Sequence, residues 1–167
     1  MELSPYIQHY PGGRHIQFPK NITSIEPFGL GGESFTIIIV PEGVIHIGRA
    51  AFLASRVVNI SLPDSLKMID DDAFSGCTRL KDIYLPNHIT HIGARAFMGC
   101  DTIREIFLPE TVEYIGDEAF AYCRRLKKVF LPEKTVLGQD VFSYNHPKIK
   151  IETYQKREDL PLPYSYS

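Results

Sequence analysis

The chain has 167 residues, with 18 Lys and Arg against 20 Asp and Glu and a formal net charge of −2 at pH 7. This length fits one domain, and the charge gives no electrostatic case for a nucleic-acid partner. No segment reaches the ~18–20 apolar residues that a membrane span needs, so membrane insertion is not predicted either.

Residues 1–12 lie outside the repeat described below, and we expect them to form an N-terminal cap or a flexible segment. The start carries an early acid, Glu2, and no long apolar run, so no signal peptide is visible. The sequence leaves two cellular locations open. The protein is cytoplasmic if Met1 is the native start, and secreted or on the cell surface if a leader has been removed.

From residue 13 to residue 152 one phrase recurs about every 23 residues. A proline sets the register in six copies, at Pro19, Pro41, Pro63, Pro86, Pro109 and Pro132. The first and the third residue before each proline are apolar, and this period of two predicts a short strand. The expected strands are 16–18, 38–40, 60–62, 83–85, 106–108 and 129–131, with a last one at 149–151. The first unit lacks the Ala-Phe pair over residues 24–36 and is degenerate.

The apolar positions of the repeat predict one shared core. No single unit can bury its isoleucines and its phenylalanine alone, but units stacked at about 4.8 Å bury them jointly. Identical positions then lie over one another, so Phe52, Phe74, Phe97 and Phe120 should form one stack.

Three cysteines occupy one register position, 23 residues apart, at Cys77, Cys100 and Cys123. No pair has the C-x2–4-C spacing of a zinc site, and a disulfide would leave one thiol over. Ser55 and Asn145 hold the same position in other units. We therefore interpret the cysteines as small buried side chains, and neither a metal nor a cofactor is predicted.

The clearest copy reads Leu80-x-x-Ile83-x-Leu85-Pro86-x-x-Ile89-x-x-Ile92-Gly93-x-x-Ala96-Phe97-x-x-Cys100. At these residues the sequence resembles the BspA-like leucine-rich repeats of bacterial surface proteins, over roughly residues 13–152. The resemblance implies a right-handed leucine-rich repeat solenoid of about six repeats. Each repeat would give one short parallel β-strand, with irregular or short helical turns on the convex side. It also implies a concave strand face that binds ligands, and a place on the cell surface with a role in adhesion for many members.

The residues between the inward apolar pairs should point to solvent on the strand face. Three neighbouring units place aromatic rings there, and large exposed apolar patches mark interaction sites. The candidate ligand-binding residues are Ile39, Tyr84, Phe107 and Phe130, with the charged residues Asp82, Glu105 and Lys128 beside them. In the last unit we expect Lys148 next to Lys128 and Lys150 next to Phe130.

No catalytic motif is present, so the predicted function is a non-enzymatic module that binds a protein or glycan ligand on its strand face. An intracellular scaffold or self-associating subunit, forming a homodimer through the same aromatics, is the alternative. Residues 153–167 contain Leu160-Pro-Leu-Pro and are expected to be a mobile C-terminal tail, although this tail could instead fold back over the aromatics.

Overall fold

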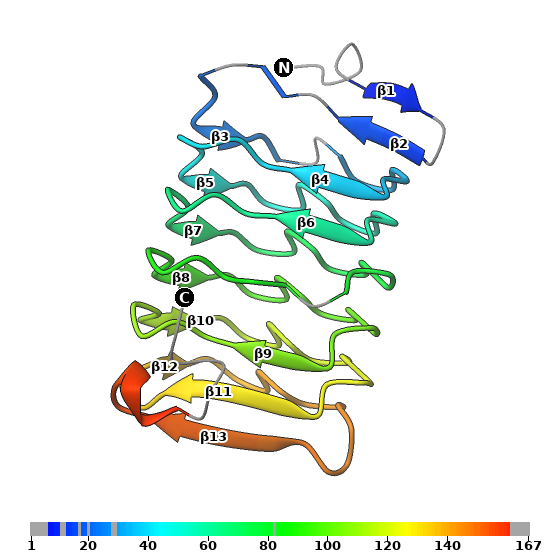
Figure 1. The fold of residues 1–167 in the computed structure, drawn as a ribbon. Helices are drawn as coiled ribbons and strands as arrows, with labels where there is room; N and C mark the ends of the chain where they lie inside the picture. The colour runs from blue at the N-terminus through cyan, green and yellow to red at the C-terminus, as the bar shows by residue number, and fades with distance from the viewer. Residues whose placement is uncertain are drawn as a thin grey trace.

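The computed structural model describes residues 7–10, 13–16, 18–19, 21–27, 30–81 and 83–160. The chain winds into a stack of coils, one coil per repeat, with almost no helix (Figure 1). The parallel β-solenoid predicted from the period of the repeat is thereby confirmed.

The strands expected before the prolines form the first side of the solenoid. They are β2 (Gly13–Ile16), β4 (Ile37–Ile39), β6 (Asn59–Ser61), β9 (Glu105–Phe107), β11 (Lys128–Pro132) and β13 (Lys150–Tyr154). Within this series β2, β4 and β6 pair in parallel with one another, and so do β9, β11 and β13. At the N-terminal end, β1 (Ile7–Tyr10) pairs antiparallel with β2.

One expected strand is missing from this side. Residues 83–85 adopt no strand, so the ladder divides into a four-stranded part, β1-β2-β4-β6, and a three-stranded part, β9-β11-β13. Figure 1 shows a coil without an arrow between β6 and β9. This interruption determines where the candidate site lies.

The second side is more regular than the irregular or short helical turns that the resemblance implied. It is a six-stranded parallel sheet of two-residue strands. These are β3 (Ser24–Ile25), β5 (His46–Ile47), β7 (Met68–Ile69), β8 (His91–Ile92), β10 (Tyr114–Ile115) and β12 (Val136–Leu137). Backbone groups in the segment between each proline and Ala-Phe pair find their partners on the neighbouring coils, such as the Gly93 amide on the Ile69 carbonyl at 2.8 Å.

The core is a column of phenylalanine rings. The ring centroids of Phe52, Phe74, Phe97 and Phe120 are 4.9, 5.1 and 5.2 Å apart in sequence order, and the planes differ by 6° or less. All four side chains are fully buried. The predicted stack is confirmed, and Phe142 extends it at 5.7 Å from Phe120.

Candidate functional site

The predicted site residues differ in how far they are exposed to solvent. Ile39 on β4 and Tyr84 on the unpaired coil are exposed, by 66% and 87% of their surface. Phe107 on β9 is half-buried, and Glu105 beside it is exposed. Asp82 lies outside the described residues.

Phe130 does not face solvent, so the expectation of an exposed ring at this position is wrong. Its side chain is fully buried, in a small apolar cluster with Tyr154 and Leu160, against which Phe107 packs. The reason is that the segment after β13 turns back over the strand face and covers the ring. Residues 154–160 therefore fold back over the aromatic residues, which was the alternative stated for the C-terminal tail.

The register of the last coil also differs from the expected one. Lys150, not Lys148, pairs with Lys128, and Glu152 pairs with Phe130. Glu152 therefore reaches Lys128, whose Nζ lies 3.4 Å from the Glu152 carboxylate and 4.4 Å from the centre of the Phe130 ring. These contacts hold Lys128 against its own sheet.

The C-terminal segment is anchored by two side chains. The strand β13 runs to Tyr154, beyond the boundary at residue 152 from which a mobile tail was expected. The Tyr154 hydroxyl donates a hydrogen bond to the Leu108 carbonyl oxygen, and burial raises the pKa of this phenol well above its ordinary value. The turn η2 (Arg157–Asp159) follows, and the Arg157 guanidinium lies over the Phe107 ring at 5.5 Å. Residues 161–167 lie outside the described part of the chain.

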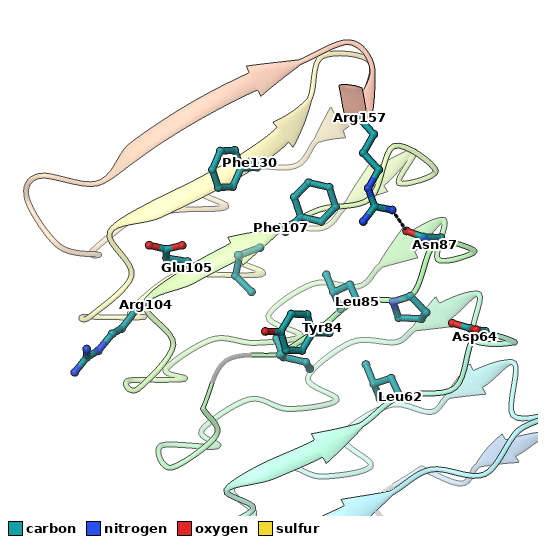
Figure 2. Close-up of a pocket in the computed structure, with 13 residues that line it drawn as sticks. Leu62, Asp64, Tyr84, Leu85, Asn87, Arg104, Glu105, Phe107, Phe130 and Arg157 are labelled. Carbon is teal, nitrogen blue, oxygen red and sulfur yellow. Dashed lines mark hydrogen bonds between the residues drawn. The ribbon is translucent and has the colours of Figure 1, made fainter. Parts of the chain in front are cut away.

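A groove of about 610 Å³ opens on the strand face where the ladder is interrupted. Figure 2 shows Tyr84 and Phe107 on neighbouring coils, with Arg157 and Asn87 joined at one side and Arg104 and Glu105 at the other. Buried Ile83, Ile106 and Phe130 also line it. An apolar floor with a few polar groups at its rim is the usual composition of a binding site.

The interruption of the sheet explains the groove. On the coil before it, Ile60 and Leu62 are only half-buried, whereas their counterparts Ile106 and Leu108 on β9 and just after it are fully buried. The unpaired coil therefore leaves apolar surface open beside β6. This surface comes from positions that the period of two assigns to the core.

Tyr84 differs from the other aromatic residues in the repeat register. Rings on neighbouring coils stack in the phenylalanine column and in the pair Tyr122 and Tyr144 at 4.6 Å, and Phe107 and Phe130 form a tilted pair at 6.3 Å. Tyr84 and Phe107 hold equivalent positions on neighbouring coils, yet no ring contact joins these two described residues. The space between them is part of the groove.

Several lining residues were not predicted from the sequence. Asp64 and Asn87 each follow a repeat proline, a position that looked like a solvated turn, and Leu62 and Leu85 were assigned to the core. Arg104 precedes a strand and Arg157 lies in the segment expected to be mobile. Of the predicted set, Tyr84, Glu105, Phe107 and Phe130 come together at the groove, whereas Ile39 and Lys128 do not line it.

The cysteines are structural, as predicted. All three thiols are free and buried. Each lies 3.1–3.3 Å from the carbonyl oxygen of a phenylalanine on the preceding coil, and Asn145 bonds the Phe120 carbonyl in the same way at 2.8 Å. Burial raises the pKa of Cys77 and of Cys123 to about 12 and that of Cys100 well above its ordinary value. Neutral, hydrogen-bonded thiols of this kind are poor nucleophiles.

Two further features concern the described residues only. Across them, no three His, Cys, Asp or Glu side chains gather as a metal site would require. The same ranges contain no helix with the length and apolar character to cross a membrane.

Stacked coils, a parallel strand in almost every coil, and a core of repeated Ile, Leu and Phe define the leucine-rich repeat class of solenoid. The BspA type leucine rich repeat region matches residues 12–52 and 23–150, with 6 copies, and the chain belongs to this family. Proteins of this family typically act as interaction modules without catalytic activity. No curated protein matches the chain.

Solved structures with the same fold come from several bacteria. A leucine-rich repeat protein from Bacteroides ovatus is 37% identical, with a TM-score of 0.68, over 88% of this chain and 38% of its own. The T. pallidum leucine rich repeat protein is 25% identical, with a TM-score of 0.67, over 78% of this chain and 72% of its own. A leucine rich cell surface protein from Faecalibacterium prausnitzii is 25% identical, with a TM-score of 0.66, over 89% of this chain and 35% of its own.

Proposed function

We propose that the chain is a non-catalytic interaction module that binds a protein ligand on its strand face, in the groove between Tyr84 and Phe107. The observation that carries this proposal is the 87% exposure of Tyr84, an aromatic side chain at the centre of a groove with an apolar floor. The likeness to a protein described as a leucine rich cell surface protein supports a place on the cell surface.

The chemistry of the groove favours binding over catalysis. The described residues that line it include no Ser, Thr, Cys, His or Lys, so no aliphatic hydroxyl, thiol, imidazole or amine is among their side chains. Its polar groups are carboxylates, guanidinium groups, one amide and the phenol of Tyr84, which suit hydrogen bonds and ion pairs with a partner. An aromatic anchor within a polar rim is the arrangement found at the energetic centres of protein interfaces.

The geometry also suggests how a ligand binds. Tyr84 and Phe107 line the groove from neighbouring coils and no ring contact joins these two residues, so an apolar side chain of the ligand can contact both rings. The buried floor formed by Ile83 and Ile106 would exclude water from that side chain. Burial of one aromatic or leucine side chain contributes about 1.5–3 kcal/mol, which makes this position the expected hot spot.

Peptides selected on the protein test the proposal. A random peptide library is panned on the wild-type chain, and affinities of the enriched peptides are measured calorimetrically for wild type, Tyr84→Ala and Tyr144→Ala. Tyr144 is a matched control because it is exposed by 69% and lies outside the groove. We expect Tyr84→Ala to weaken binding at least tenfold at an unchanged melting temperature, and Tyr144→Ala to bind the peptides as tightly as wild type does.

Equal affinities of the selected peptides for wild type and Tyr84→Ala would contradict the proposal. Sedimentation of the same three proteins tests the alternative of self-association. A wild-type dimer that Tyr84→Ala converts to a monomer would assign the groove to a second copy of the chain instead.

A further inference from the structure

The formal net charge of −2 conceals a separation of charge between two corners of the solenoid. Where the chain enters the strands of the strand face, several coils carry Lys or Arg. Five of these residues, on three consecutive coils, form what we call the basic stripe: Arg79, Lys81, Arg104, Arg125 and Lys127. All five are exposed, and within the described residues none of them forms an ion pair.

The stripe is continuous because the coils stack in register. The Lys81 amide bonds the Val58 carbonyl at 2.9 Å, and the Lys127 amide bonds the Arg104 carbonyl at 2.8 Å. Lys127 therefore lies over Arg104, about 4.8 Å away. Lys81 holds the same repeat position on the coil before Arg104, 23 residues earlier. The same register places Arg79 over Arg56, which is also exposed and extends the stripe by one coil. This corner lies at the right of Figure 1, where β9 and β11 begin.

The opposite corner, where the strands end, is acidic. The exposed residues Glu42, Asp64, Glu110 and Glu133 follow the repeat prolines there. A strand of about five residues separates the corners by roughly 15 Å, nearly two Debye lengths at physiological ionic strength. The acids of that corner therefore do not cancel the positive potential of the stripe. Nearer acids are Glu33, whose carbonyl accepts the Arg56 amide, Asp101, which lies 4.0 Å from Arg124, and Glu105 on the strand face; Asp82 is outside the described residues.

We propose that the basic stripe, which shares only Arg104 with the groove, is a second binding surface and that it binds a linear sulfated polysaccharide. A row of cations along one axis matches a polymer with anionic groups at regular intervals. Guanidinium groups form paired hydrogen bonds with oxyanions, and three of the five residues are arginines.

A nucleic acid fits the stripe less well. Proteins that hold single strands combine cations with aromatic rings on which bases stack. The two columns of the stripe contain no aromatic residue. Of the exposed rings near them along the chain, Tyr122 stacks on Tyr144, and Tyr84 lines the groove. The stripe also lies on an exposed corner, where duplex recognition would require an element that enters a groove.

The test uses the full chain and a size-defined heparin fragment as the probe. The stripe variant is Arg79→Gln/Arg125→Gln/Lys127→Gln, which leaves Arg104 in place because Arg104 also lines the groove. The control is Lys67→Gln/Lys134→Gln/Lys156→Gln, which removes three exposed cations outside the stripe and so changes the net charge equally. Melting temperatures of both variants should equal that of wild type, because all six side chains are exposed.

We expect the stripe variant to bind the heparin fragment at least tenfold more weakly than wild type at ~50–100 mM salt. The slope of log affinity against log salt should fall in magnitude by about two. Each contact between a cation and a phosphate of a nucleic acid contributes about 0.7–0.9 to this slope, and three contacts between cations and sulfates should act similarly. The control should match wild type. Chemically desulfated heparin of the same length should bind at least tenfold more weakly than the sulfated fragment.

Two results would overturn the proposal. Equal loss of heparin binding in the stripe variant and the control would show a response to net charge alone. Binding of desulfated heparin or of a single-stranded DNA oligonucleotide as tight as that of the sulfated fragment would show that the stripe does not select sulfate. Loss of heparin binding with unchanged affinity for the groove-selected peptides would also show that the two surfaces act separately.

Discussion

Arg157 and Asn87 are 70 residues apart in sequence, and the guanidinium group of Arg157 donates a hydrogen bond of 3.1 Å to the side-chain carbonyl oxygen of Asn87. The same guanidinium lies over the ring of Phe107. These contacts join the turn η2 to the coil that interrupts the strand ladder. One wall of the groove is therefore built by the C-terminal segment and not by a repeat.

The anchoring of that segment predicts its susceptibility to trypsin. Tyr154→Phe removes the hydrogen bond to the Leu108 carbonyl, a buried bond whose loss costs about 1–2 kcal/mol. Opening of residues 154–160 should then be about 5–30 times more frequent, and cleavage after Lys156 or Arg157 faster by the same factor when opening is in rapid equilibrium. Tyr144→Phe is the control, since that phenol is on an exposed side chain. Identical cleavage rates for the two variants would contradict this role of Tyr154.

The backbone of the turns predicts a stabilising substitution. Ala54 has a φ of 53°, in the left-handed region, and the equivalent positions of the next two coils hold Gly76 and Gly99 with φ of 72° and 70°. A non-glycine residue in the left-handed region destabilises the folded state by about 1–2 kcal/mol, and glycine avoids this cost. Glycine also makes the unfolded chain more flexible, which offsets part of the gain. Ala54→Gly should therefore raise the free energy of unfolding by about 0.5–1 kcal/mol in urea titrations.

The control for this substitution is Ala51→Gly, at a fully buried position outside the left-handed region. It should lower the free energy of unfolding, because it removes a packed methyl group and gains no conformational relief. If both variants are destabilised equally, the strain assigned to Ala54 is absent.

The buried thiols predict a dependence of stability on pH. The folded chain holds the pKa of Cys77 and Cys123 at about 12 and also raises that of Cys100, whereas in the unfolded chain thiols have an ordinary value of 9.0. Above pH 9 the unfolded state therefore releases protons that the folded state retains. The free energy of unfolding should fall as pH rises from about 9 toward 12, by up to about 1.4 kcal/mol per pH unit for each thiol.

The matched variant replaces all three cysteines by serine. Ser55 already holds this register position and donates to the Glu33 carbonyl at 3.0 Å, so the hydroxyl groups should find the same kind of acceptor. Between pH 8.5 and pH 10, denaturant titrations should show a shallower fall for this variant than for wild type. Above pH 10 the buried phenol of Tyr154 adds a fall common to both proteins, because burial also raises its pKa. Parallel curves below pH 10 would rule out the thiols as the cause.

The repeat itself made most of the fold predictable. The Ala-Phe positions predicted the aromatic column because identical residues in stacked coils must meet, and the cysteine positions predicted buried thiols for the same reason. The strand at 83–85 was also predicted from its period of two, but it is absent. Strand pairing depends on both neighbouring coils, and the residues of one coil do not determine it.

The candidate site was less predictable than the fold. Tyr84 and Glu105 are exposed at the positions that the alternation assigned to solvent. Phe130 occupies the same register but is buried, since the segment that covers it has no repeat and so gave no pattern to read. Arg157 was missed for the same reason, and Asp64 and Asn87 were missed because residues after a proline usually belong to solvated turns.

The near-constant spacing of the phenylalanine column has a consequence for the length of such a chain. Because Phe74, Phe97 and Phe120 meet their neighbours at 5.1 and 5.2 Å with parallel planes, each junction between coils is nearly interchangeable with the next. Removal of the 23 residues from Ser75 to Phe97 would bring Phe74 onto Phe120 with the same kind of contact. Whole coils can thus be gained or lost by duplication or deletion without a new core, whereas the groove, which occurs at one interruption, survives such events only when both of its walls are retained.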